Sequence, residues 1–147
     1  MDCPQSTFGF LAELNLFSIQ LICMNLPQAP IKTAIPDSVS YRCVCGTDIQ
    51  PTLDFARRLE QLGRPMWIRF VLVPGLTDAR DNVEGLAEFA ASLKNVERVE
   101  VLPFHKMGEF KWQELRLSYK LADTQPPTPE ALEEVKRAFS SRGLTVV

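Results

Sequence analysis

Two apolar runs separated by a helical pattern dominate the second half of this chain. The run "MWIRFVLVPG" predicts a strand, because eight mostly β-branched, aromatic or aliphatic residues end at the pair Pro74-Gly75. Apolar residues at both alternating positions favour a strand covered on both faces. A second strand is expected from Arg98 to Phe104. Between the two runs, apolar residues recur at helical spacing and predict a buried stripe of Val83, Leu86, Ala87, Ala90 and Leu93.

Further helices are predicted on both sides of this unit. Pro51 to Leu62 reads as a helix that ends at Gly63, with one apolar face formed by Leu53, Ala56, Leu59 and Leu62. Thr77 or Asp78 is expected to cap the middle helix. A short helix is expected over 109–115, and a last one begins with Thr128 as its cap and Pro129 at its first position. The final "LTVV" suggests a short strand.

The alternation of helices and strands is typical of βα units that build a parallel sheet. We therefore expect an α/β fold with parallel strands. A closed eight-stranded barrel needs roughly 200 residues or more. The 147 residues present can then form part of a barrel or a small open sheet.

The composition changes near residue 40. Residues 1–40 contain three acidic side chains and one basic one, whereas acidic and basic side chains are equally numerous in 41–147. The proline-containing stretch from Leu26 to Ser38 predicts an irregular connector. The apolar stretch from Phe8 to Leu26 is interrupted by polar residues, which favours a buried helix or strand over a membrane span. We expect a boundary between 1–40 and 41–147.

Charge and cysteine content exclude several function classes. The net charge is −2 and no basic stripe is present, so nucleic acid is not an expected partner. None of the four cysteines forms a CxxC pair, which favours free thiols in a reducing cytoplasm over a disulfide framework or a metal site. The four are Cys3, Cys23, Cys43 and Cys45. The sequence predicts no metal ligands and no membrane partner.

The single histidine, His105, follows the second predicted strand. Working groups of parallel α/β folds gather at the carboxyl ends of the strands. An imidazole there can bind a polar ligand, since its pKa lies near neutrality. It can equally well cap backbone groups at the strand end. Position alone leaves both interpretations open.

Arg69 is a charge inside the apolar run "WIRFVLV". A charge in a buried strand must be paired. Arg69 can form an ion pair, with Glu100 of the other strand as the candidate. It can also clamp an anion, because a guanidinium binds a carboxylate through two parallel hydrogen bonds.

Several of these segments occur together in one known family. The segments "QPTLDFARRL", "WIRFVLVPGLTD", "NVERVEVLPFHKMGEFKW", "LSYKL" and "PPTPE", preceded by a YRxVxG start at Tyr41, follow one another here. In this order they resemble the C-terminal part of the pyruvate formate-lyase activating enzymes, which are radical S-adenosylmethionine (SAM) enzymes. The resemblance covers about residues 41–147. It implies the C-terminal portion of a partial (β/α)6 barrel.

The resemblance also implies a chemistry and its partners. The family binds a 4Fe-4S cluster through CxxxCxxC, receives an electron from flavodoxin or ferredoxin, and cleaves SAM to place a glycyl radical on pyruvate formate-lyase. His105 matches the family histidine that contacts SAM, and Arg69 matches an arginine near the same site. The loop 106–112 is a weaker candidate for the surface that faces the protein partner. No residue is assigned a catalytic role.

The chain also departs from the family pattern. It contains no CxxxCxxC, no glycine-rich GGE segment and no Asp-x-Lys element, and residues 1–36 do not align. We therefore expect a fragment that resembles an oxidoreductase and is inactive as a lone chain. The alternatives are a non-catalytic module that docks a glycyl radical enzyme or other protein, and an unrelated small α/β domain.

Overall fold

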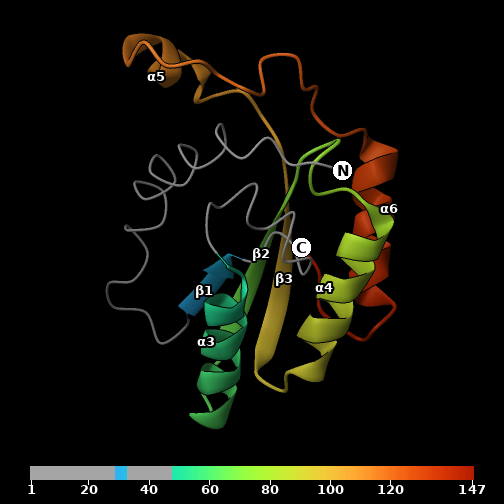
Figure 1. Cartoon of the computed structure of the whole chain (residues 1–147). Helices are drawn as coiled ribbons and strands as arrows, with labels where there is room; N and C mark the ends of the chain where they lie inside the picture. The colour runs from blue at the N-terminus through green and yellow to red at the C-terminus, as the bar shows by residue number, and fades with distance from the viewer. Residues whose placement is uncertain (1–28, 33–47) are drawn as a thin grey trace.

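A computed structural model describes residues 29–32 and 48–147 (Figure 1). The elements of these residues alternate between strands and helices along the chain. The strands are β1 (Ala29–Lys32), β2 (Met66–Leu72) and β3 (Val96–Pro103). The helices are α3 (Gln50–Gln61), α4 (Arg80–Ser92), α5 (Glu109–Glu114) and α6 (Pro129–Ser140).

The three strands form one parallel sheet in the order β1-β2-β3. This arrangement confirms the predicted α/β class and its alternation of parallel strands with helices. The connector expected from Leu26 to Ser38 is wrong for Ala29–Lys32, which pairs with Met66–Arg69 as β1. Pro30 is tolerated there because β1 is the outer strand of the described sheet, where a missing backbone N–H is least costly. The rest of that stretch, with the segment from Phe8 to Leu26, lies outside the described residues.

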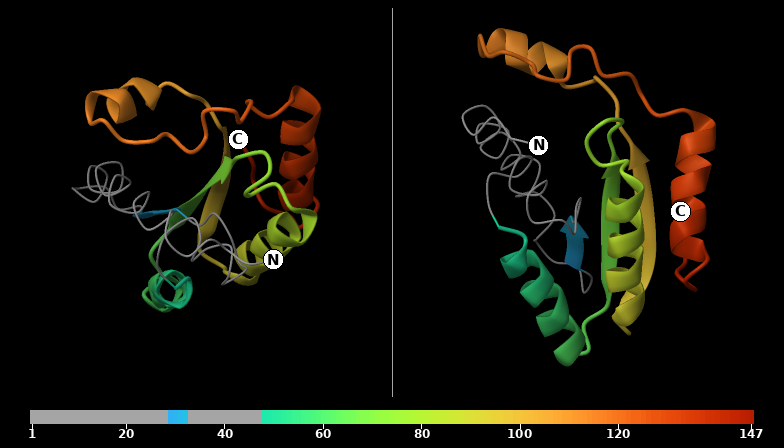
Figure 2. Two further views of the ribbon diagram at one scale, coloured as in Figure 1. Left: turned by 45° about the horizontal axis from the view of Figure 1, so that its top comes forward. Right: turned by 45° about the vertical axis from the view of Figure 1, so that its right-hand side comes forward.

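The core lies between the sheet and the helices α4 and α6, which stand side by side along it (Figure 2). Alternate residues of β2 point toward the helices and are buried: Ile68, Phe70 and Leu72 in this core, and Met66 in a second cluster with Ala56 and Leu59 of α3. The rings of Phe70 and Phe139 meet with centroids 5.9 Å apart. The predicted stripe of α4 is confirmed, because each of its five residues is buried.

The opposite face of β2 is less covered than its apolar sequence suggested. Trp67 and Arg69 are half-buried, and Val71 is exposed. The prediction of a strand covered on both faces is therefore wrong for the part of the chain that the structure describes. Of the described helices, α3, α4 and α6 contribute to the cores on the face of β2 that carries Ile68 and Phe70. We call the opposite face, which carries Trp67, Arg69 and Val71, the open face.

The helix ends follow local rules in most places. Gly63 has a φ of +60° just after α3, as expected of a glycine that ends a helix. Thr128 accepts a hydrogen bond from Ala131 N at 3.2 Å and caps α6, with Pro129 in its first turn. Leu62 was predicted to join the apolar face of α3, but it lies beyond the last helical residue and is exposed. The final residues add one parallel bridge, between Val146 and Val99.

Neither Thr77 nor Asp78 caps α4, contrary to the prediction. The residue before that helix is Ala79, and no side chain caps it. Thr77 Oγ1 instead accepts from Val73 N at 2.7 Å and donates to Val71 O at 2.8 Å. Asp78 accepts from Gly75 N at 2.8 Å. Both side chains thus fix the turn after β2, which short-range hydrogen bonding of this kind favours over helix capping.

We expect Thr77→Val to lower the free energy of unfolding by about 2 kcal/mol, because it leaves buried backbone groups unpaired. Thr77 is 2% exposed, so water does not replace the lost bonds. Thr77→Ser keeps the hydroxyl and removes one methyl group, which should cost about 0.8 kcal/mol. Urea unfolding of both variants tests this. A valine variant that is more stable than the serine variant would contradict it.

None of the helices in the described part of the chain is long and apolar enough to cross a bilayer.

Candidate ligand-binding face

The open face carries a group of polar and aromatic side chains on β2 and β3. Residues two apart in a strand share a face. The parallel register places Trp67 opposite Arg98 and Arg69 opposite Glu100. Two cross-strand pairs are therefore neighbours in the middle of the sheet, on the side away from the core of α4 and α6.

Glu100 lies at the centre of this group. Its Oε2 accepts from Arg69 Nε at 2.6 Å, and its Oε1 lies 2.7 Å from Arg98 NH2. The Glu100 side chain is 13% exposed, compared with 29% for Arg69 and 35% for Arg98. One carboxylate thus serves two guanidinium groups, and these three side chains together carry one net positive charge.

Trp67 and Arg98 extend the group toward the start of the strands. The guanidinium carbon of Arg98 lies 3.4 Å from the centroid of the Trp67 ring, within cation–π range. The indole N–H of Trp67 donates to Glu97 Oε2 at 2.9 Å. Sequence reasoning missed Trp67 and Arg98. The signal that could have found them is their spacing, since Trp67 stands two residues before Arg69 and Arg98 two residues before Glu100.

The ion pair predicted between Arg69 and Glu100 is confirmed. It uses Nε of the guanidinium, while the terminal nitrogens NH1 and NH2 make no hydrogen bond within the described residues. Those two nitrogens form the edge of a guanidinium that binds a carboxylate with two parallel bonds. The anion-clamp interpretation is therefore compatible with the ion pair and stays a prediction.

His105 follows β3, as the sequence predicted, and its side chain is exposed. Its Nδ1 accepts from Met107 N at 3.4 Å, a long contact that holds the ring weakly. Nε2 has no partner in the part of the chain that the structure describes. The histidine thus makes one local backbone contact and leaves its other nitrogen available to a ligand.

Within the described residues, no hydrogen bond or ion pair joins His105 to Arg69. Arg69 lies opposite Glu100, and His105 follows Glu100 by five residues along the chain. A strand rises about 3.3 Å per residue, which corresponds to about 16 Å if the chain stays extended. A single ligand that contacts both side chains must lie along β3 rather than sit at one point.

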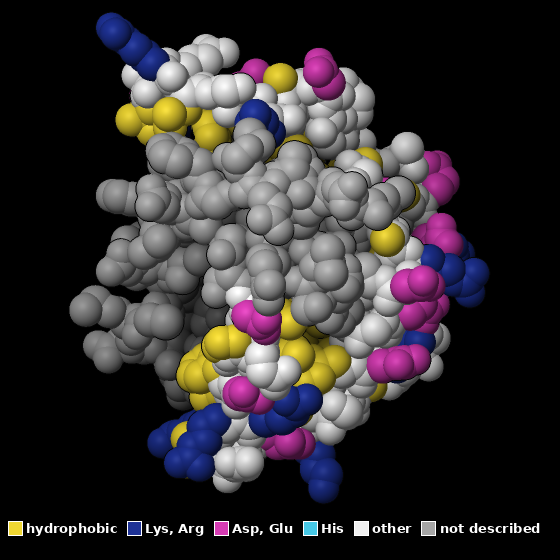
Figure 3. All heavy atoms as spheres, in the orientation of Figure 1, with side chains coloured by type: hydrophobic (Ala, Val, Ile, Leu, Met, Phe, Trp, Pro, Cys, Tyr) yellow, Lys and Arg dark blue, Asp and Glu magenta, His cyan; other side chains and the backbone are white. Residues whose placement is uncertain are grey.

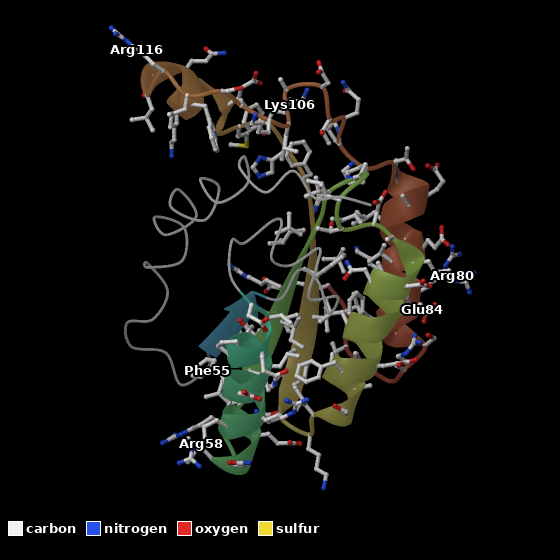
Figure 4. All side chains as sticks on the ribbon, in the orientation of Figure 1. Phe55, Arg58, Arg80, Glu84, Lys106 and Arg116 are labelled. Atoms are coloured by element: carbon white, nitrogen blue, oxygen red, sulfur yellow. The ribbon has the colours of Figure 1, made fainter. Side chains whose placement is uncertain are left out.

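Residues 106–122, which follow His105 and include α5, form an arm that stands away from the sheet (Figure 1). Lys106, near the start of the arm, donates a hydrogen bond to the carbonyl of Ala122, and Figure 4 shows it far from Arg116 at the tip. The rings of Trp112 and Tyr119 meet at 5.6 Å. Burial, and then the negative charge of Glu109, raise the pKa of the Tyr119 phenol. Contacts within the arm therefore hold it together.

The arm also exposes apolar side chains. Met107 is 77% exposed, and Phe110 and Leu115 are exposed as well. In Figure 3 hydrophobic side chains gather along the lower edge of this region. These three residues are what we call the arm patch.

A groove lies elsewhere, between α4 and α6. It measures about 580 Å³ and is lined by Arg80 and Glu84 of α4, seen beside α6 in Figure 4, and by residues of α6 such as Glu134 and Arg137. Neither Arg69 nor His105 lines it. The two predicted site residues therefore belong to the open face and not to this groove.

The residues that could hold an iron–sulfur cluster do not fit one. The sequence contains no CxxxCxxC, and all four cysteines lie outside the described residues. Within the described ranges, no group of three or more His, Cys, Asp or Glu side chains could hold a metal ion. We therefore assign no cluster ligand in this chain.

The chain is similar to several curated proteins. It is 46% identical over 107 residues to the pyruvate formate-lyase-activating enzyme of Streptococcus mutans. The aligned region covers 73% of this chain and 40% of that relative. The enzyme of Staphylococcus aureus strain COL is 44% identical over 91 residues, covering 62% of this chain and 36% of that protein. The chain thus spans less than half the length of these relatives. It matches no family model.

Two solved structures share the fold. One is a domain of pyruvate-formate lyase-activating enzyme from Bacteroides vulgatus, with a TM-score of 0.68 and 23% identity over 84% of this chain and 67% of the other. The second is a radical SAM methyltransferase from Sphaerobacter thermophilus, with a TM-score of 0.63 and 17% identity over 95% of this chain and 37% of the other. These likenesses show the fold alone, and they are consistent with part of a barrel. Over about three quarters of its length, the chain is related to the pyruvate formate-lyase-activating enzymes.

Proposed function

We propose that this chain supplies the SAM-contacting, C-terminal part of a glycyl-radical-activating enzyme that acts on pyruvate formate-lyase. Flavodoxin or ferredoxin is the proposed electron donor, and the cytoplasm the proposed compartment. In this proposal residues 41–147 form the barrel part. Residues 1–40 are a divergent segment, of which β1 adds a strand to the same sheet.

The observation that carries this proposal is the state of Arg69 on the open face. Its Nε is bound by Glu100 and its terminal nitrogens have no partner among the described residues. Arg69 then binds a carboxylate of SAM or of the partner polypeptide beside it. His105 donates or accepts one hydrogen bond through Nε2 at the carboxyl end of β3.

We further propose that the lone chain cannot carry out the redox step. The residues present do not fit a 4Fe-4S cluster, so no step of the reaction is assigned to this chain beyond binding and orienting. The cluster-binding cysteines must come from polypeptide outside this sequence.

We expect Arg69→Met to weaken SAM binding on the order of 30-fold, because it removes a charge-assisted, two-point contact. His105→Ala should weaken binding about tenfold, as expected for one hydrogen bond. Equilibrium dialysis with radiolabelled SAM measures both. The matched control is Arg80→Met, since Arg80 is 86% exposed on α4, away from the open face. Equal affinity of the Arg69 and Arg80 variants would contradict the proposal.

The arm patch favours a second candidate function, a module that docks a glycyl radical enzyme without chemistry. Met107, Phe110 and Leu115 are exposed apolar residues close to one another in the chain. In this case purified pyruvate formate-lyase should be retained by the immobilised chain and by its His105→Ala variant alike. A triple change of the patch to serine should abolish retention. Retention that depends on His105 and on added SAM would instead favour the first proposal.

A further inference from the structure

We propose that Glu100 is a positioning residue that aims Arg69 at its ligand, and that Arg98 stacked on Trp67 holds Glu100 in place. This inference rests on the proposed function, since it deepens the role of Arg69. It adds three side chains on two strands to the site, none of which contacts the ligand itself.

The two oxygens of the Glu100 carboxylate contact different arginines. Oε2 binds Arg69 Nε at 2.6 Å, and Oε1 binds Arg98 NH2 at 2.7 Å. Oε2 therefore accepts a short, charge-assisted hydrogen bond from Arg69, and Oε1 forms an ion pair with Arg98. Because both oxygens are engaged, rotation of the carboxylate would break two contacts at once.

The bond to Glu100 also sets the direction of the Arg69 guanidinium plane. A guanidinium is planar, and its donors have fixed directions in that plane. When Nε–H points at Glu100, the edge formed by NH1 and NH2 must point elsewhere, and no described residue accepts from it. Glu100 thus holds Arg69 through Nε. The two terminal nitrogens remain available to bind a carboxylate at two points.

Arg98 restricts the rotamers of Glu100. Free Arg and Glu side chains have many rotamers, and a ligand that must order them binds more weakly. Arg98 lies 3.4 Å above the centre of the Trp67 ring, and Trp67 donates to Glu97 at 2.9 Å. The register pairs Trp67 with Arg98 and Arg69 with Glu100. Backbone pairing and stacking therefore order the site during folding, before any ligand arrives.

Charge balance gives the group its sign. Two guanidinium groups around one carboxylate leave one net positive charge on the three side chains Arg69, Arg98 and Glu100. An anionic group of the ligand is attracted to this charge. A cationic group, such as the sulfonium of SAM, is expected to lie away from it.

The test compares Glu100→Gln with Glu133→Gln, which is the same chemical change at an exposed carboxylate of α6 that pairs with Lys136. We expect Glu100→Gln to weaken SAM binding about tenfold in equilibrium dialysis, and Glu133→Gln to leave it unchanged. In the Arg69→Met background, Glu100→Gln should have no further effect, because Glu100 acts through Arg69. Arg98→Met keeps the apolar stem on Trp67 and should weaken binding by a smaller factor, about threefold.

A second measurement, the exchange of the Arg69 Nε–H proton with water, needs no SAM, and the backbone signals in the same spectrum report whether the variant is folded. In the NMR spectrum, the Nε–H signal of Arg69 should exchange slowly with water in the wild type and fast in Glu100→Gln, while backbone signals of the core stay in place. If Glu100→Gln leaves both this signal and the affinity for SAM unchanged, the positioning role is wrong while SAM binding stands. The wild type could bind no SAM and still show a slowly exchanging Arg69 signal that exchanges fast in Glu100→Gln. In that case the positioning role stands and the proposed function is wrong.

Discussion

Phe139→Ala is expected to lower the free energy of unfolding by about 3–5 kcal/mol, the range observed when a buried phenylalanine is truncated. Phe139 is completely buried, and its ring meets that of Phe70 on β2 at 5.9 Å. It is one of the two buried residues by which α6 packs against the sheet, the other being Val135. Removing the ring therefore leaves a cavity between the helix and the strand that alanine cannot fill.

The matched control is Phe110→Ala in α5. Phe110 is 53% exposed and no residue of α5 is buried, so the same truncation should change stability by about 0.5 kcal/mol or less. Urea unfolding followed by circular dichroism measures both. Similar losses for the two variants would show that α6 does not pack on the sheet as described.

The second large effect is the complete absence of cluster assembly and SAM cleavage in the lone chain. After anaerobic treatment with iron and sulfide, this chain should show no visible absorbance from a thiolate-ligated cluster, and it should release no 5′-deoxyadenosine from SAM on reduction. The reason is the sequence, in which Cys43 and Cys45 are separated by one residue and no CxxxCxxC occurs. The Streptococcus mutans relative, treated in the same way, is the positive control for reconstitution. A brown chain that cleaves SAM would overturn the proposed division of labour.

Much of the fold could be predicted from local patterns. The alternation of apolar runs and helical repeats gave β2, α4 and β3 in the right order, and the buried stripe of α4 is as expected. Caps at Thr128 and a stop at Gly63 follow from chemistry within a few residues. These features depend on neighbours in the chain, so a sequence contains the information they need.

The features that sequence reasoning missed depend on contacts across the fold. β1 was hidden because Pro30 and its neighbours lack a strand pattern, and the strand exists by pairing with β2. Thr77 looked like a cap, yet its hydroxyl serves backbone groups that the preceding turn brings close. The contact of Arg98 with Trp67 requires the register between β2 and β3, which no single-strand pattern specifies.

The candidate site could be predicted in part for the same reason. Arg69 was noticeable as a charge in an apolar run, and its pairing with Glu100 is confirmed. The sharing of Glu100 by two arginines could not be foreseen, because it depends on side-chain directions on the open face. The binding roles of Arg69 and His105 remain predictions.

Binding of SAM on the open face is tested most directly by an NMR titration of the isotope-labelled chain with SAM. We expect the side-chain Nε signal of Arg69 and the ring signals of His105 to shift together and saturate. Signals of Glu84 and Glu134 in the groove between α4 and α6 should stay in place. Saturating shifts in the groove, with Arg69 and His105 unchanged, would contradict the account.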